Sequence, residues 1–108
     1  MAKMNKEDLL AAYLLVGADE LKQQRSVARL KQYLTPEFVD FNLEEHASAS
    51  GLEEEVLINS LQVLPFGDSR RLVIVWEADK LPKEVSEALV RYLNNPNPSS
   101  ILVLIAHS

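Results

Sequence analysis

The sequence predicts a three-layer α/β domain in which helices cover both faces of a mostly parallel sheet of four strands. Apolar segments of strand length alternate with amphipathic segments of helical period along the whole chain. Parallel strands need long crossover connections, and three amphipathic segments stand in the right places to supply them. Because such crossovers are right-handed, the sheet is expected to be doubly wound.

The first strand is predicted over residues 12–16, whose continuous apolar sequence is typical of a strand buried on both faces. It ends at Gly17, and a helix follows from Asp19, a suitable N-cap, to Leu34. Pro36 ends this helix, since the residue before a proline is disfavoured in helical conformation. The apolar positions of the helix recur at helical spacing: Val27, Leu30 and Leu34.

The second strand is predicted over residues 38–43, which alternate apolar and polar side chains only in part and therefore indicate a position nearer an edge. Residues 44–51 are polar and are expected to form a surface loop. Ser50 is a candidate cap for a second helix, which Pro65 and Gly67 end. The buried stripe of that helix is expected to consist of Leu57, Leu61 and Leu64.

The third strand is predicted over residues 71–76, and the third helix opens at Leu81-Pro82. A turn over 94–100 leads to the last strand, 101–106. The chain ends two residues beyond this core strand, so it is expected to be a fragment that stops before later elements. The inner face of the third helix is assigned to Val85, Ala88, Leu89 and Tyr92.

The composition restricts the class of protein. The chain has 108 residues, expected to form one domain over 1–108, and no cysteine, which excludes disulfide scaffolds and thiol catalysis. No apolar run approaches the ~18 residues of a membrane span, and the opening MAKMNKEDLL lacks the apolar segment of a signal peptide. We therefore expect a cytoplasmic protein. With a net charge of −5, it is expected to contact DNA only weakly or indirectly.

A nucleotide site is not expected after the first strand. A phosphate-binding loop needs G-x-x-x-x-G-K-[ST], but after Gly17 the second glycine, the lysine and the hydroxyl residue are missing. Asp19 and Glu20 instead place carboxylates where a helix N-terminus would attract phosphate. At the end of the third strand Trp76 stands where an ATPase needs an aspartate, and only Glu77 remains. We expect no catalytic residue, cofactor or metal.

One turn has the character of a binding feature. Pro65 lies between Leu64 and Phe66 at the end of the second helix, and its fixed φ favours a rigid turn. An exposed phenylalanine in such a turn can anchor an interface. The alternative is that both apolar side chains pack into the core.

Three segments resemble a known family: YLLVGADEL, LQVLPFGDSRRLVIVWEADKL and ALVRYLNNPNPSSILVLIAHS. Their order and spacing are similar to the N-terminal domain of the delta subunit of bacterial DNA polymerase III, a clamp-loader subunit. WEADKL looks like an AAA+ Walker B stretch that has lost its aspartate. The resemblance implies a P-loop/AAA+-like sheet in a degenerate AAA+ domain that binds no ATP. Gly17, Asp19, Trp76 and Glu77 mark its degenerate nucleotide site.

The resemblance also implies a function in DNA replication, within the DNA-directed DNA polymerase III complex. Family members bind the sliding clamp (beta) and open it while other clamp-loader subunits hydrolyse ATP; the full-length protein has further helical domains. The clamp-binding residues would be Gln62, Val63, Leu64, Pro65 and Phe66. This sequence departs from some members in having Pro65 between the leucine and the phenylalanine.

Two other functions stay open from the sequence. One is a nucleotide-binding AAA+/P-loop-like ATPase with an irregular phosphate loop. Only the predicted fold and Glu77 suggest this function. The other is direct DNA contact by the basic side chains of the first helix, although we interpret these charges as a solvated helix face. Those side chains are Lys22, Arg25, Arg29 and Lys31.

Overall fold

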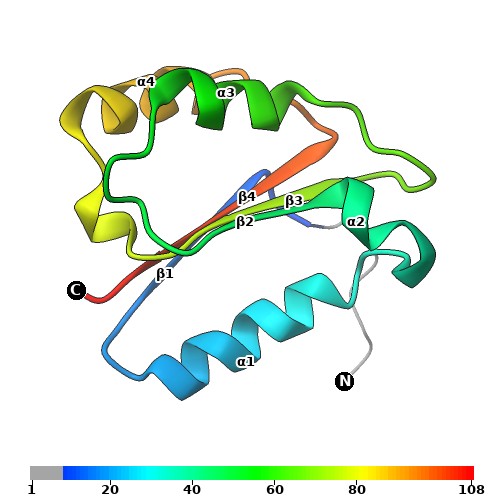
Figure 1. The fold of residues 1–108 in the computed structure, drawn as a ribbon, viewed down its shortest axis with the longest axis horizontal. Coiled ribbons are helices and arrows are strands. Elements are labelled where there is room, and N and C mark those ends of the chain that lie inside the picture. The colour runs from blue at the N-terminus through cyan, green and yellow to red at the C-terminus, as the bar shows by residue number, and fades with distance from the viewer. Residues whose placement is uncertain (1–8) are drawn as a thin grey trace.

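The sheet of this protein has four parallel strands in the order β1-β4-β3-β2 (Figure 1). The structure is a computed structural model that describes residues 9–108. The strands are β1 (Ala12–Val16), β2 (Leu43–His46), β3 (Arg71–Val75) and β4 (Ser100–Ala106). The last strand in the sequence therefore lies between the first and the third.

Helices cover both faces of the sheet, as Figure 1 shows. α1 (Glu20–Lys31) lies on one face, and α3 (Glu54–Gln62) and α4 (Lys83–Leu93) lie on the other. These are the three crossover helices, so the predicted α/β class and doubly wound sheet are confirmed. The short helix α2 (Val39–Asn42) and two 3₁₀ turns, Pro36–Phe38 and Ala78–Lys80, complete the described elements. Within residues 9–108, no helix combines the length and apolar character needed to cross a membrane.

The core consists of two apolar layers, one on each side of the sheet. Leu57 and Leu61 of α3 and Val85 and Leu89 of α4 pack over one face, and Val27 of α1 packs over the other. β3 is buried along its whole length because its side chains enter both layers in alternation. The two central strands thus hold the layers together.

The prediction that residues 12–16 are buried on both faces is wrong. β1 pairs only with β4 among the described strands and forms an edge of the sheet. Its Leu14 and Val16 are 64% and 58% exposed, because they share the face of Ala12 and α3 and α4 do not cover them. Tyr13 and Leu15 pack against the layer under α1.

The predicted strand over 38–43 is also wrong. Residues 36–42 form a 3₁₀ turn followed by α2, so that only residue 43 of the predicted strand is extended. β2 occupies residues 43–46, of which 44–46 were expected to be loop. Pro36 stands in the first turn of this helical segment, where a missing N–H costs nothing. The short β2 carries polar side chains because it lies at the other edge of the sheet.

The helix boundaries agree with the sequence in some places and not in others. The Asp19 cap is confirmed, since its Oδ1 accepts a hydrogen bond from the backbone N–H of Lys22 at 3.0 Å. α1 ends at Lys31 rather than at Leu34, although Leu34 is buried. α3 begins after Glu53 and not after Ser50. It ends at Gln62, so the predicted burial of Leu64 in its stripe is wrong.

Candidate functional site: an exposed turn and a cavity at the strand ends

The turn that follows α3 presents apolar side chains to solvent. Leu64 is 75% exposed and Phe66 is 58% exposed, and Val63 is also exposed. Pro65 is partly buried between them, and Gln62, the last residue of α3, is exposed. Of the two alternatives that the sequence left open, the structure therefore shows the exposed turn and not the buried pair.

Asn42, at the end of α2, holds this turn in place. Its side-chain amide accepts a hydrogen bond from the backbone N–H of Phe66 at 2.8 Å and donates one to the Phe66 carbonyl at 2.7 Å. Asn42 has no exposed surface. This pair of bonds fixes the peptide units on both sides of Phe66.

The helix end that precedes the turn is fixed as well. The carbonyl of Leu61 accepts hydrogen bonds from Ser100 Oγ at 2.8 Å and from Asn97 Nδ2 at 2.9 Å. The last carbonyls of a helix have no intrahelical partner, so these two side chains supply one. Both come from the start of β4 and the loop before it. The segment from Gln62 to Pro65 is thus held between two anchors.

The return to β3 is tied to the segment before α2. Asp68 Oδ2 accepts a hydrogen bond from the backbone N–H of Thr35 at 2.7 Å. Gly67 adopts a φ of +67°, and a Cβ built there would lie 2.5 Å from the Phe38 ring. Only glycine combines this left-handed conformation with so close an approach. The turn is therefore packed against the helical segment 36–42.

Three aromatic rings gather at this place. The Phe66 ring lies 5.4 Å from Phe38 in an edge-to-face arrangement and 5.0 Å from Phe41 in a tilted one. Phe38 is partly buried and Phe41 is 61% exposed. Sequence reasoning missed both Phe41 and Asn42, because it assigned them to a strand. The i, i+3 spacing of Phe38 and Phe41, next to Pro36, was the available signal for a helical segment.

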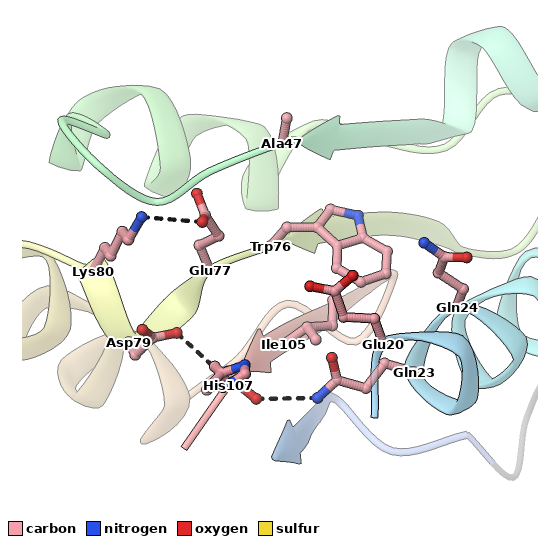
Figure 2. Close-up of a pocket in the computed structure, with 11 residues that line it drawn as sticks. Glu20, Gln23, Gln24, Ala47, Trp76, Glu77, Asp79, Lys80, Ile105 and His107 are labelled. Atoms are coloured by element: carbon pink, nitrogen blue, oxygen red, sulfur yellow. Dashed lines mark hydrogen bonds and ion pairs between the residues drawn. The ribbon is translucent and has the colours of Figure 1, made fainter. Parts of the chain in front are cut away.

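A second feature is a cavity of about 510 Å³ at the carboxyl ends of the strands (Figure 2). Ligands of open parallel sheets bind at this edge. Trp76 and Glu77 line the cavity, whereas Gly17 and Asp19 do not. The other lining residues are Glu20, Gln23, Gln24, Ala47, Asp79, Lys80, Ile105, Ala106 and His107.

The first βα turn is closed by hydrogen bonds within the chain. The N–H of Gly17 donates to the Ala106 carbonyl at 3.1 Å, and the Gly17 carbonyl accepts from Gln23 Nε2 at 2.7 Å. Gln23 Nε2 also donates to the Ala106 carbonyl at 3.1 Å. These groups are engaged with each other at the position where a phosphate loop would offer free N–H groups.

The cavity is lined by more negative than positive side chains. Hydrogen bonds from the Ser48 side chain and then from Lys80 lower the pKa of Glu77, whose Oε2 lies 3.0 Å from Lys80 Nζ. The backbone N–H of His107, which donates to Asp79 Oδ1 at 3.2 Å, lowers the pKa of Asp79. Both carboxyl groups are therefore ionised at neutral pH. Within residues 9–108, no group of three acidic or histidine side chains is arranged to hold a metal ion.

Trp76 and Glu77 each have a structural role. The indole Nε1 of Trp76 donates to Glu45 Oε2 at 2.6 Å, which joins the end of β3 to β2. Glu77 adopts a φ of +53°, a left-handed conformation that is uncommon outside glycine, asparagine and aspartate. Its backbone begins the 3₁₀ turn that leads to α4.

The sheet order and the placement of the helices define a doubly wound α/β domain. The family model for DNA polymerase III, delta subunit, matches residues 13–108, and the chain therefore belongs to that family. The resemblance stated from the sequence is confirmed.

Two solved structures are similar to this chain. The DNA clamp loader delta protein of Bacillus subtilis is 29% identical over 94% of this chain and 32% of its own, with a TM-score of 0.81. A DNA polymerase III gamma subunit-related protein of Thermotoga maritima is 17% identical over 89% of this chain and 34% of its own, with a TM-score of 0.71, and shows the fold alone. The chain spans about a third of each. No match is found among curated proteins.

Proposed function

We propose that this domain binds the sliding clamp of bacterial DNA polymerase III through the turn at Leu64, Pro65 and Phe66. The observation that supports this function most directly is the exposure of Leu64 and Phe66 on a turn anchored at Leu61 and at Phe66. Residues 1–108 would form one degenerate AAA+-like domain. Membership in the delta-subunit family makes the clamp the partner to test first.

The physics of association favours such a turn. A phenylalanine side chain buries about 150–250 Å² when it enters a pocket. Side chains on a fixed backbone lose less conformational entropy on binding than those on a mobile loop. Gln62 lies beside the apolar pair and is exposed, so its amide can satisfy polar groups at the rim of the pocket. Val63 adds apolar contact area next to it.

Clamp opening would follow from differential affinity. A protein shifts the equilibrium between a closed and an opened ring only by binding one of them more tightly. ATP hydrolysis by this domain is not needed for such a shift. The ionised Glu77 and Asp79 in the strand-end cavity would repel a triphosphate, which supports a domain without its own catalytic site or cofactor.

Other partners follow from the family. The other clamp-loader subunits would be bound by the full-length protein within the cytoplasmic polymerase III complex. With a net charge of −5, this domain would contact DNA weakly or only through the clamp.

The test is the binding of Leu64→Ala/Phe66→Ala to the clamp of the same organism, measured by surface plasmon resonance. Loss of two anchors is expected to weaken binding about 1,000-fold, since each anchor is worth about 2 kcal/mol and every 1.4 kcal/mol is a factor of ten. Leu21→Ala, which removes an equally exposed apolar side chain on α1, is the matched control and should bind like the wild type. Unchanged affinity of the double variant would contradict the proposed docking site.

A nucleotide-binding function is the second candidate, because the cavity lies where parallel sheets bind ligands and contains Lys80. Calorimetric titration with ATP and Mg²⁺ separates the two functions. We expect no saturable heat. Tight, magnesium-dependent binding that Trp76 fluorescence also reports would support the ATPase alternative instead.

A further inference from the structure

An apolar surface continues beyond the turn onto α2. The Phe41 ring contacts the Phe66 ring at a centroid distance of 5.0 Å, and both side chains are more than half exposed. The two residues belong to different segments, 25 positions apart in the sequence. Exposed large apolar side chains that lie singly need no explanation, whereas contiguous ones mark interaction sites.

We propose that Phe41 is a second contact of the clamp-binding surface and that Asn42 is the positioning residue that fixes Phe66 beside Phe41. The role of both residues rests on the proposed clamp binding. The surface, called here the two-segment surface, consists of Leu64 and Phe66 from the turn and Phe41 from α2. It enlarges the contact from a short linear peptide to a composite patch.

The backbone of Phe41 is also held in place. Its carbonyl accepts a hydrogen bond from Arg71 Nη1 at 3.3 Å, and Arg71 is buried at the start of β3. The next residue, Asn42, is fully buried and makes the two bonds to Phe66. Phe41 is therefore exposed on a fixed backbone, between two buried polar side chains, and not on a mobile loop.

The occupant of this surface is the same clamp that the turn engages. Phe41 touches Phe66, so a pocket that receives Phe66 brings the partner's wall within reach of Phe41. Despite this contact, Phe41 and Phe66 stay 61% and 58% exposed. Glu37 and Asp40 are exposed on the same helical segment as Phe41. An apolar pocket with neutral or basic side chains at its rim would complement this segment.

The role of Phe41 is tested by Phe41→Ala and Phe41→Leu in a clamp-binding measurement. We expect Phe41→Ala to weaken binding about tenfold, with the faster dissociation that is usual for interface variants. Phe41→Leu should retain most of the affinity because it keeps an apolar side chain. Val90→Ala, an exposed apolar position on α4, is the control that should bind like the wild type.

The positioning role of Asn42 needs a readout that loss of stability alone would not change. Asn42→Ala is therefore compared in the wild type and in a Phe66→Ala background. We expect it to weaken binding about tenfold in the first and less than about twofold in the second, because its effect acts through the position of Phe66. Val85→Ala, a buried change in α4, destabilises the fold without touching the surface and should leave the affinity unchanged below its melting temperature.

The outcomes separate this inference from the proposed function. If Leu64→Ala/Phe66→Ala abolishes binding while Phe41→Ala has no effect, the proposed clamp binding is supported and the proposal that Phe41 contributes to it is wrong. An equal effect of Asn42→Ala in both backgrounds overturns its positioning role. If neither Phe66→Ala nor Phe41→Ala changes binding, the turn is not the docking site. That result contradicts the proposed function itself, and with it the role of Phe41.

Discussion

The side chain of Asn42 and the backbone of Phe66 are joined by two hydrogen bonds, of 2.8 Å and 2.7 Å, across 24 positions of sequence. The bonds connect the end of α2 to the turn after α3, two segments that lie near the same end of the sheet in Figure 1. A helical segment on one side of the domain thus determines the shape of an exposed turn that otherwise carries only apolar side chains. Folding and the presentation of the turn depend on the same pair.

Asn42→Ala is predicted to lower the free energy of unfolding by about 2 kcal/mol. The change removes both hydrogen bonds to the Phe66 backbone, which are partly buried, and each such bond contributes about 0.5–1.5 kcal/mol. Urea denaturation followed by circular dichroism measures the loss. Asn59→Ala, at an exposed position of α3, is the control and should change stability by less than about 0.5 kcal/mol. Equal stability of the two variants would show that water replaces the Asn42 bonds.

Gly67→Ala is predicted to be more destabilising than Gly51→Ala, although both glycines have a positive φ, +67° and +72°. Each change places an alanine in the left-handed region, at a cost of about 1–2 kcal/mol. At Gly51 the new Cβ meets open space, whereas at Gly67 it meets the Phe38 ring at 2.5 Å. The difference between the two free energies of unfolding therefore reports the contact with Phe38. Equal losses would mean that the ring moves aside without cost.

The sequence predicts the central part of the fold well because local and tertiary preferences agree there. Residues 72–75 are apolar without alternation, as a strand buried on both faces requires, and β3 has that environment. Asp19 caps α1 in the structure as its residue type predicts. At residues 38–43 partial alternation resembled a strand, but the i, i+3 pair Phe38 and Phe41 packs with a ring 25 or more positions away.

The sequence predicts the candidate site only in part, because some of its features are local and others depend on distant segments. Pro65 and the apolar pair beside it are visible in the sequence as a turn, and the structure exposes that turn. Its supports are not visible, because Asn42 and Ser100 reach it from segments distant in the chain. The order of the strands is equally non-local. An apolar run such as residues 12–16 cannot say whether a helix covers both of its faces.

Stability is predicted to decrease in acid in part through Glu45. Burial raises the pKa of this carboxyl group, but hydrogen bonds from Lys31 and Trp76 outweigh burial and hold the pKa below its ordinary value of 4.5. A carboxyl group whose pKa is lowered by folding stabilises the fold above its unfolded pKa, and this contribution is lost as the pH falls through the folded value. Glu45→Gln should therefore destabilise the protein at neutral pH and have little effect below that folded pKa.

The fluorescence of Trp76, the only tryptophan, reports both unfolding and the local change at Glu45. Glu87→Gln, at an exposed position of α4, serves as the control and should leave the acid limb of the stability curve as it is in the wild type. An acid limb that Glu45→Gln also leaves unaltered would assign the acid sensitivity to other carboxyl groups.

Leu14→Ala and Leu102→Ala are predicted to differ in stability by about 2 kcal/mol or more, although both remove a leucine from the same face of adjacent strands. Leu102 is fully buried under α3 and α4, where Leu→Ala leaves a cavity and costs about 2–5 kcal/mol. Leu14 is 64% exposed on the edge strand β1, so its truncation removes little buried area. Urea denaturation of both variants measures the difference. If Leu14→Ala were as costly as Leu102→Ala, Leu14 would have to be covered in solution.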